Sequence, residues 1–168
     1  MAKSDESLRS TRLVFYKEDI EIIGKTLNTF LKNANARCAL LVDKDGHMVT
    51  KEGESATYDM DTISALVAGS FAATKQMAKL LGEEEFSIMF HQGKKDNIQL
   101  SVVGDRTILA VIFDDRTTLG MVRLYASQVS SKLAQVFDGI SERKSEGEKI
   151  SLDFGNAAKG KLDDLFGN

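Results

Sequence analysis

Residues 61–82 read DTISALVAGSFAATKQMAKLLG, and this stretch predicts a long helix with two faces of different character. Asp59 or Asp61 can cap its start by accepting from free backbone N–H groups, and Gly82 is typical of the position just past a helix end. At 100° per residue, one face gathers apolar side chains that we expect to pack on a sheet. That face comprises Ile63, Leu66, Val67, Phe71, Thr74, Met77 and Leu81.

The opposite face of this predicted helix has almost no large side chains. It carries Ala65, Ala68, Gly69 and Ala72, followed by Lys75, Gln76 and Lys79. A solvated helix face usually carries Glu and Lys, whereas Ala and Gly let a second backbone or helix come close. Alanine is also the best helix former, so such a face can simply meet nothing. Because a glycine within a helix costs about 1 kcal/mol, Gly69 favours a docking surface.

The flanking sequence supplies two further helices and a sheet. Apolar residues at helical spacing predict a helix at 17–33 and a last helix that runs from a cap at Thr117 or Thr118 to Ile140. Short apolar runs bounded by turn residues predict five strands, at 37–42, 47–50, 86–91, 97–103 and 107–113.

These elements predict a mixed α/β (α+β) fold, namely a three-layer sandwich. One five-stranded antiparallel sheet has one helix on one face and two on the other. The strand at 107–113 is apolar throughout and should be central, whereas the alternating strand at 97–103 predicts one buried face there. The helix at 61–82 is too narrow to cover five strands, so a homodimer would hide the excess apolar area.

Composition predicts one domain with two tails. The chain has 168 residues, 42% of them hydrophobic, which suits a single core. We expect a flexible N-terminal arm at 1–13, one domain at 14–142, and a flexible linker with a C-terminal docking helix at 143–168. In that tail Leu162, Leu165 and Phe166 stand at helical spacing beside two aspartates.

Charge and hydropathy exclude several classes of protein. A net charge of −3 argues against a nucleic-acid binder. No apolar run approaches the roughly 18 residues that span a bilayer, and the N-terminus lacks the hydrophobic segment of a signal peptide. We therefore expect a cytoplasmic protein without membrane insertion. The single Cys38 lies in the apolar run CALLV and is expected to be a small buried hydrophobe.

No motif predicts a catalytic residue, a metal site or a cofactor. His47 and His91 lie in predicted strands without further ligands at zinc spacing. The run Asp43-Lys44-Asp45-Gly46 resembles the start of a calcium loop, but the bidentate glutamate is missing from the required frame, so a hairpin turn is favoured. No P-loop or nucleophile elbow is present.

The remaining charged clusters are exposed turns rather than tuned catalytic groups. Residues 83–85 are three adjacent glutamates, and Asp114 and Asp115 are likewise neighbours, so burial and spacing that would shift their pKa values are lacking. An arginine on a loop, such as Arg116, could stabilise a phosphoryl-transfer transition state in trans. A salt bridge to Asp114 or Asp115 is the favoured interpretation.

Four stretches resemble the Roadblock and dynein light-chain family. They are ARCALLVDKDGHMV at 36–49, LVAGSFAATKQMAKLLGEEEFSIMFHQGKKDNIQLSVVG at 66–104, LAVIFDDRTTLGMVRL at 109–124 and KLDDLFGN at 161–168. The likeness covers roughly Phe15 to Ile140 and the C-terminal motif. Among family members, the central part of the sequence is most similar to a bacterial regulator of a small Ras-like GTPase.

This resemblance implies a homodimer that binds a GTP-loaded Ras-like GTPase, two protomers to one, and controls cell polarity or motility from the cytoplasm, at a cell pole. It would speed hydrolysis by repositioning the GTPase's own switch residues and arginine, without an arginine finger. Contact would fall on the paired helices, at Ala65, Ala68, Gly69, Ala72 and Gln76.

The resemblance also implies a second contact through the C-terminal helix, which can influence nucleotide exchange. The matching residues are Lys161, Leu162, Asp163, Asp164, Leu165 and Phe166. A competing interpretation is a dimeric scaffold or adaptor that stimulates nothing, because many Roadblock proteins are subunits of motor or signalling complexes. An enzyme in its own right has no supporting site.

Overall fold

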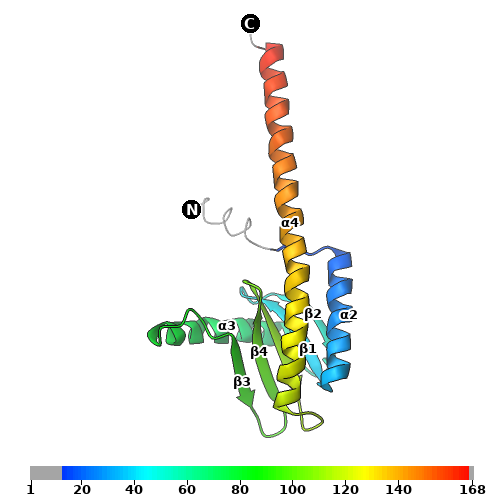
Figure 1. The fold of residues 1–168 in the computed structure, drawn as a ribbon, viewed down its shortest axis with the longest axis vertical. Coiled ribbons are helices and arrows are strands. Elements are labelled where there is room, and N and C mark those ends of the chain that lie inside the picture. The colour runs from blue at the N-terminus through cyan, green and yellow to red at the C-terminus, as the bar shows by residue number, and fades with distance from the viewer. Residues whose placement is uncertain (1–12, 167–168) are drawn as a thin grey trace. The chain divides into compact units, whose positions relative to one another are not determined.

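The computed structural model describes residues 13–166 of the chain (Figure 1). The N-terminal arm predicted at 1–13 lies, apart from Leu13, outside these residues. Residues 16–136 form one compact unit. The described residues 13–15 and 137–166 belong to a second unit.

The order of helices and strands is the predicted one: helix, two strands, helix, three strands, helix. The elements are α2 (Lys17–Ala34), β1 (Cys38–Asp43), β2 (Met48–Gly53), α3 (Met60–Leu80), β3 (Ile88–Gln92), β4 (Asn97–Val103), β5 (Thr107–Phe113) and α4 (Leu119–Phe166).

One antiparallel sheet holds all five strands in the order β2-β1-β5-β4-β3. Strand β5 is central, as its continuous apolar sequence predicts, and all seven of its residues are buried. Its Ala110 lies opposite Leu40 of β1 on one side and Leu100 of β4 on the other. The sheet therefore ends in two edge strands, β2 and β3.

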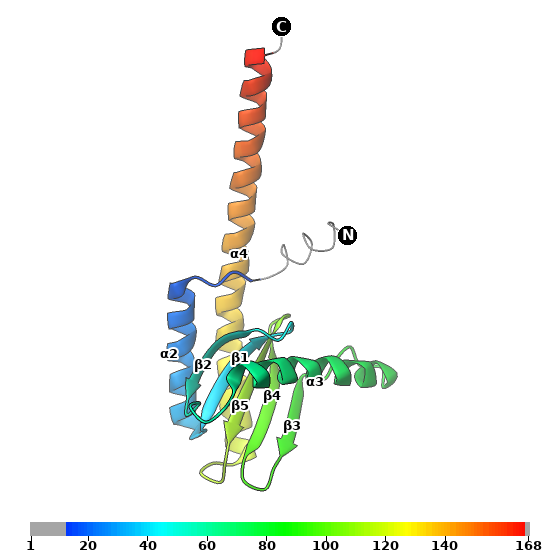
Figure 2. The same cartoon turned by 180° about the vertical axis from the view of Figure 1, so that it is seen from behind.

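The three-layer arrangement is confirmed. Helix α3 covers one face of the sheet, and α2 with the first part of α4 covers the other (Figures 1 and 2). On the α3 side, Met60, Val67 and Phe71 pack against a cluster that includes Leu40 and Ile108 of the central strands. Burial of these apolar side chains stabilises the packing of α3 on the sheet.

The prediction that strand β4 buries only one face is wrong. The polar side chains of Gln99 and Ser101 are 1% and 7% exposed, and they lie on the face that α2 and α4 cover. The amide Nε2 of Gln99 donates to Ser101 Oγ at 3.3 Å. Alternation in sequence usually marks a solvated face, but here a second helical layer replaces the solvent.

Helix α4 is longer than predicted. Thr118 Oγ1 accepts from the backbone N–H of Met121 at 3.3 Å, which confirms Thr118 as its cap. Residues 143–160 are helical, whereas the sequence predicts a flexible linker there. The segment has no proline, and an isolated glycine lowers helix stability without ending a helix. The domain division after residue 142 stays a prediction.

Within the second unit, Phe15 and Phe137 meet edge to face with their ring centroids 5.9 Å apart. Among the described residues, no helix combines the length and the apolar composition that a membrane crossing requires.

Candidate partner-binding site

Both ends of α3 are fixed by the predicted residues. Asp59 caps the start: its Oδ1 accepts from the backbone N–H of Thr62 at 3.1 Å, and its Oδ2 accepts from the Thr62 hydroxyl at 2.6 Å. The hydroxyl bond and then the backbone bond lower the pKa of Asp59. Gly82, at φ +83°, and Glu83 donate to the carbonyls of Lys79 and Ala78, which is a Schellman motif.

The side of α3 that packs on the sheet is rotated from the predicted one. Leu66, Met77 and Leu81 were expected to face the sheet, but they are 65%, 57% and 70% exposed. Small residues occupy much of the buried side instead, which comprises Met60, Ser64, Val67, Ala68, Phe71 and Ala78. When a helix has apolar residues on both sides, the sequence periodicity identifies both sides as possible interfaces. It does not show which side packs against the core of the protein.

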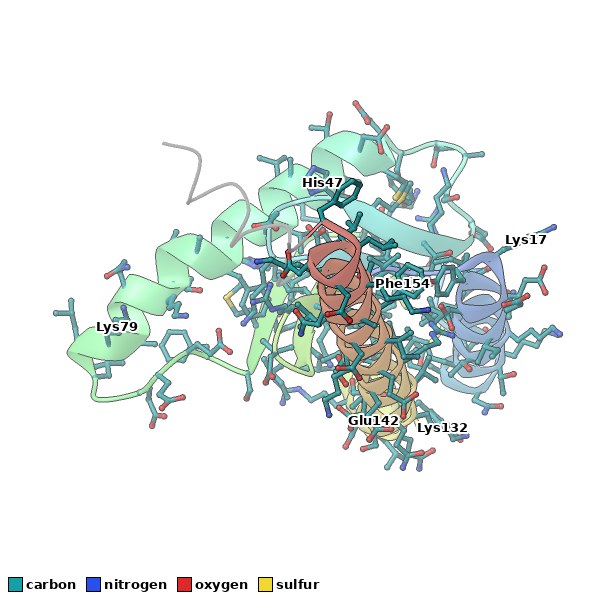
Figure 3. The ribbon with its side chains drawn as sticks, turned by 90° about the horizontal axis from the view of Figure 1, so that it is seen from above. Lys17, His47, Lys79, Lys132, Glu142 and Phe154 are labelled. Carbon is teal, nitrogen blue, oxygen red and sulfur yellow. The ribbon has the colours of Figure 1, made fainter. Side chains whose placement is uncertain are left out.

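The C-terminal part of α3 extends beyond edge strand β3 (Figure 2). Lys79 lies near this far end (Figure 3). Here Met77 and Leu80 are 57% and 87% exposed. Exposed apolar side chains clustered on one helix end indicate an interaction surface, whereas scattered ones do not.

We call the solvent-exposed side of this helix the outer face of α3. Its apolar residues Leu66, Ala73, Met77 and Leu80 recur at i, i+7, i+11 and i+14, and its remaining members lie beside them. The outer face consists of Ala65, Leu66, Gly69, Ala72, Ala73, Gln76, Met77 and Leu80. The large apolar members were not predicted as contact residues, although their helical spacing was visible in the sequence.

Ala68, predicted as an exposed contact residue, is instead buried, with 7% of its surface accessible. It lies against the β1–β2 turn, where a Cβ added to Gly46 would come within 3.7 Å of Ala68 Cβ and 3.3 Å of Ala65 Cα. Gly46 also has a φ of +95°, which favours glycine. Part of the small-residue pattern therefore serves packing within one protomer.

Gly69 has a different environment. A Cβ at this position would meet no atom within 4 Å among the described residues. Helix propensity opposes a glycine here by about 1 kcal/mol relative to alanine. Packing inside the described protomer therefore gives no reason for this glycine.

The C-terminal candidates all lie on α4 and are exposed. Leu162, Leu165 and Phe166 are 53%, 78% and 83% exposed. This apolar stripe begins earlier than the sequence predicts, because Ile150 and Phe154 are also 69% and 77% exposed. Phe154, Ala158, Leu162 and Leu165 follow helical spacing of i, i+4, i+8 and i+11.

Arg116 forms the predicted salt bridge with Asp114, between Nε and Oδ1 at 3.0 Å. A second pair joins Arg116 Nη1 to Glu54 Oε1, also at 3.0 Å. Hydrogen bonds from Arg116 lower the pKa of both carboxyl groups, and Arg37 contributes to the shift at Glu54. The guanidinium of Arg116 is thus held against the protein's own carboxylates.

The other chemical candidates have structural roles. Cys38 is buried, and desolvation raises the pKa of its thiol to about 11, so it is not a thiolate at neutral pH. Asp43 Oδ1 accepts from the backbone N–H groups of Asp45 and His47, which makes this segment a hairpin turn. The described residues contain no group of three or more His, Cys, Asp or Glu side chains placed to hold a metal ion.

Comparison with known proteins defines the class. The sequence profile of the Roadblock/LC7 domain matches residues 22–113, which is more than half of the chain, and the chain belongs to this family. Within it, the chain is similar to MglB from Myxococcus xanthus, with 40% identity, a TM-score of 0.72 and coverage of 76% of this chain and 96% of that one.

Two further solved structures are similar over the same share of each chain. The gliding protein MglB from Thermus thermophilus is 33% identical, with a TM-score of 0.71 and coverage of 76% and 96%. An MglB in a tetrameric arrangement is 31% identical, with a TM-score of 0.73 and the same coverage.

Proposed function

We propose that this protein is an MglB-like homodimeric regulator that binds a GTP-loaded, MglA-like small GTPase and stimulates its GTP hydrolysis. The observation that carries the proposal is the outer face of α3, an exposed apolar and small-residue surface on a chain 40% identical to MglB of Myxococcus xanthus. Such a surface is typical of protein association.

The dimer would form through α3 and the adjacent strand edge. β3 is an edge strand, and its Ile88 is 49% exposed. An unpaired edge next to a projecting apolar helix end favours addition of a second copy about a two-fold axis. The tetrameric arrangement of a similar MglB supports self-association as a property of this type of chain.

In the dimer, the two α3 helices would present one composite surface to the GTPase. Ala65, Gly69, Ala72 and Gln76 are exposed, and apart from Gln76 they are small enough for a switch region to approach the helix backbone. Ala68 would not contact the GTPase, because it is buried in its own protomer.

Stimulation would proceed without an arginine finger. Arg116 is paired with Asp114 and Glu54, and Arg37 Nη1 lies 2.7 Å from Asp96 Oδ1. Inserting either arginine into a partner would require breaking these pairs. Instead, binding would favour the GTPase conformation in which its own switch residues and arginine are aligned for hydrolysis.

The exposed C-terminal part of α4 would form a second contact with the GTPase and promote nucleotide exchange. Leu162, Leu165 and Phe166 would enter an apolar groove, and Asp163 and Asp164 would meet basic residues at its rim. The process served would be cell polarity or gliding motility, controlled from the cytoplasm at a cell pole. The similarity to the gliding protein MglB of Thermus thermophilus supports this assignment.

The test is phosphate release from an MglA-like GTPase preloaded with GTP, with and without this protein. We expect an increase of at least roughly tenfold in the hydrolysis rate at saturating dimer, equivalent to about 1.4 kcal/mol of barrier lowering. Binding measured in parallel by biolayer interferometry separates the alternatives. Tight binding without acceleration would identify a dimeric scaffold, and absence of both would contradict the proposal.

A further inference from the structure

A second candidate site is a groove lined by residues of α2 and α4. These two helices lie on the face of the sheet opposite α3 (Figures 1 and 2). The hollow has a volume of about 220 Å³, and all of its residues belong to the unit formed by residues 16–136. It is lined by Lys25, Thr26, Thr29, Phe30 and Asn33 of α2 and by Tyr125, Gln128, Val129 and Lys132 of α4.

The groove has an apolar floor and a basic rim. Phe30 and Val129 are 3% and 4% exposed and form the floor, whereas Lys25 and Lys132 are exposed. The Lys132 side chain extends outward from α4 (Figure 3). No lining residue is acidic, although the whole chain has a net charge of −3. Within residues 13–166, neither lysine has an ion-pair partner.

The hydroxyl groups in the groove are oriented to accept hydrogen bonds. Thr26 Oγ1 donates its proton to the carbonyl of Ile22 at 2.8 Å, and Thr29 Oγ1 donates to the carbonyl of Lys25 at 3.1 Å. Their remaining lone pairs can accept from the N–H groups of a bound backbone. The amides of Asn33 and Gln128 can both donate and accept.

The size of the hollow limits what it can hold. Pockets for drug-sized ligands are typically 300–1,000 Å³, so this one suits one or two anchoring side chains of a larger partner. We propose that the groove between α2 and α4 binds a short acidic peptide segment of a partner protein. An apolar side chain would fill the floor over Phe30 and Val129, and flanking carboxylates would pair with Lys25 and Lys132.

The groove would let one protomer engage two partners. The outer face of α3 lies on the other face of the sheet, so a peptide in the groove leaves that surface accessible (Figure 2). The inference does not rest on the proposed function, because a scaffold without GTPase stimulation could use the same groove.

The probe is a fluorescein-labelled octapeptide of sequence EDELFEDE, measured by fluorescence anisotropy with the full-length protein at low salt. We expect saturable binding that weakens as salt is added. The double variant K25E/K132E should bind at least tenfold more weakly. The matched control K94E/K95E makes the same charge change at exposed lysines of the β3–β4 turn and should bind like the wild type.

Two further measurements decide whether the groove itself is used. A peptide in which serine replaces the leucine and phenylalanine should bind at least tenfold more weakly, and the parent peptide should shift the amide NMR signals of residues lining the groove in the wild-type protein. The proposal would be overturned if K25E/K132E and K94E/K95E lost peptide affinity equally, or if the serine peptide bound as tightly as the parent peptide. It would also be overturned if the parent peptide did not bind at 1 mM, or if the NMR shifts were confined to α3. Circular dichroism checks that the variants are folded, and the GTPase assay remains independent of all these outcomes.

Discussion

Arg37 and Arg116 join the loops at one end of the sheet. Arg37 precedes β1 and pairs with Asp96, which precedes β4, and its guanidinium lies 5.6 Å from the centroid of the Tyr58 ring. Both arginines contact Glu54, which follows β2. Exposed pairs contribute little individually, but a shared carboxylate fixes the positions of several loops at once. These two residues therefore act in the fold of their own protomer.

Arg116→Ala should leave stimulation of the GTPase within about tenfold of the wild type, because removal of a true finger costs about 10³ to 10⁵ in rate. The variant should unfold at a lower temperature than the wild type. Arg106→Ala, at an exposed turn position, is the control for a lost arginine. Single-turnover hydrolysis at saturating protein is the measurement. A loss of 10³ or more with unchanged binding would establish a finger mechanism.

The cap at Asp59 makes α3 sensitive to acid. Hydrogen bonds from Thr62 lower the pKa of Asp59, so the folded state holds its proton more weakly than the unfolded state. The stabilisation is therefore complete above the ordinary carboxyl pKa of about 4 and is lost as pH falls through the lower, folded value. Asp59→Ala should reduce the urea midpoint at pH 7 and have less effect below about pH 4.

Urea unfolding followed by circular dichroism between pH 2.5 and 7 measures this difference. Asp105→Ala, at an exposed position in the β4–β5 turn, controls for removal of a carboxylate without a cap. A constant difference between wild type and Asp59→Ala over the whole range would contradict the role of the ionised cap.

Among the elements, those with one dominant sequence signal were predictable. β5 has no polar residue apart from Thr107, and its central place follows from that. Helix α3 has capping residues at both ends, so its bounds could be predicted from the sequence. The side of the helix that packs on the sheet could not. Ser64, Ala68 and Ala78 lie on the buried side of α3, because small residues let the helix come close to the sheet. A pattern of hydrophobicity instead predicts that the larger Leu66 is buried, but Leu66 is exposed.

The candidate site shows the same division. Gly69 and Ala72 were identified as exposed helix positions from the absence of large side chains, and the structure places them there. The groove between α2 and α4 could not be predicted, because its floor and rim come from helices about 100 residues apart. Such a site depends on tertiary packing, which local sequence patterns do not encode.

Two substitutions on α3 separate folding from binding. Ala72→Arg places a long cation at an exposed position, so stability should change by about 0.5 kcal/mol or less while GTPase binding is lost. Ala68→Arg forces the same side chain into a site that is 7% exposed and should cost about 3 kcal/mol or more. Chemical denaturation and biolayer interferometry measure the two effects.

The matched control for Ala72→Arg is Ser127→Arg, at an exposed position on α4. It should bind the GTPase like the wild type. Undiminished binding by a folded Ala72→Arg variant would place the GTPase contact elsewhere on the protein.

At the scale of the whole molecule, the outer face of α3 predicts a dimer. Met77 and Leu80 are exposed apolar side chains near the end of α3 that passes edge strand β3, so Leu80→Asp should weaken self-association by at least tenfold. Sedimentation velocity at micromolar concentration measures the self-association of the wild type and the variant. Leu152→Asp, at another exposed leucine, on α4, is the control. A wild-type protein that sediments as a monomer at these concentrations would contradict both the dimer and the composite GTPase surface.

The C-terminal part of α4 should act as a tethered second contact. Truncation after Gly160 removes Leu162, Leu165 and Phe166 but leaves residues 16–136 intact. The dimer and part of the stimulation should therefore persist. Attachment to a docked dimer makes binding of the tail intramolecular, at an effective concentration in the millimolar range, so even a weak motif should raise affinity by roughly ten- to a hundredfold. The truncated protein should bind the GTP-loaded GTPase more weakly by that factor or change its nucleotide exchange rate.

Point variants test whether the apolar stripe itself carries this effect. L162D/L165D should reproduce the truncation, because two carboxylates oppose entry into an apolar groove. K149D/N156D places two aspartates at exposed positions on the other side of α4 and should behave like the full-length protein. The exposed part of α4 has little tertiary packing to stabilise it, so circular dichroism must show that both double variants keep equal helix content. Equal affinity and equal exchange rates for the full-length protein, the truncation and L162D/L165D would show that the tail does not contact the GTPase, and its exposed stripe would then require another partner.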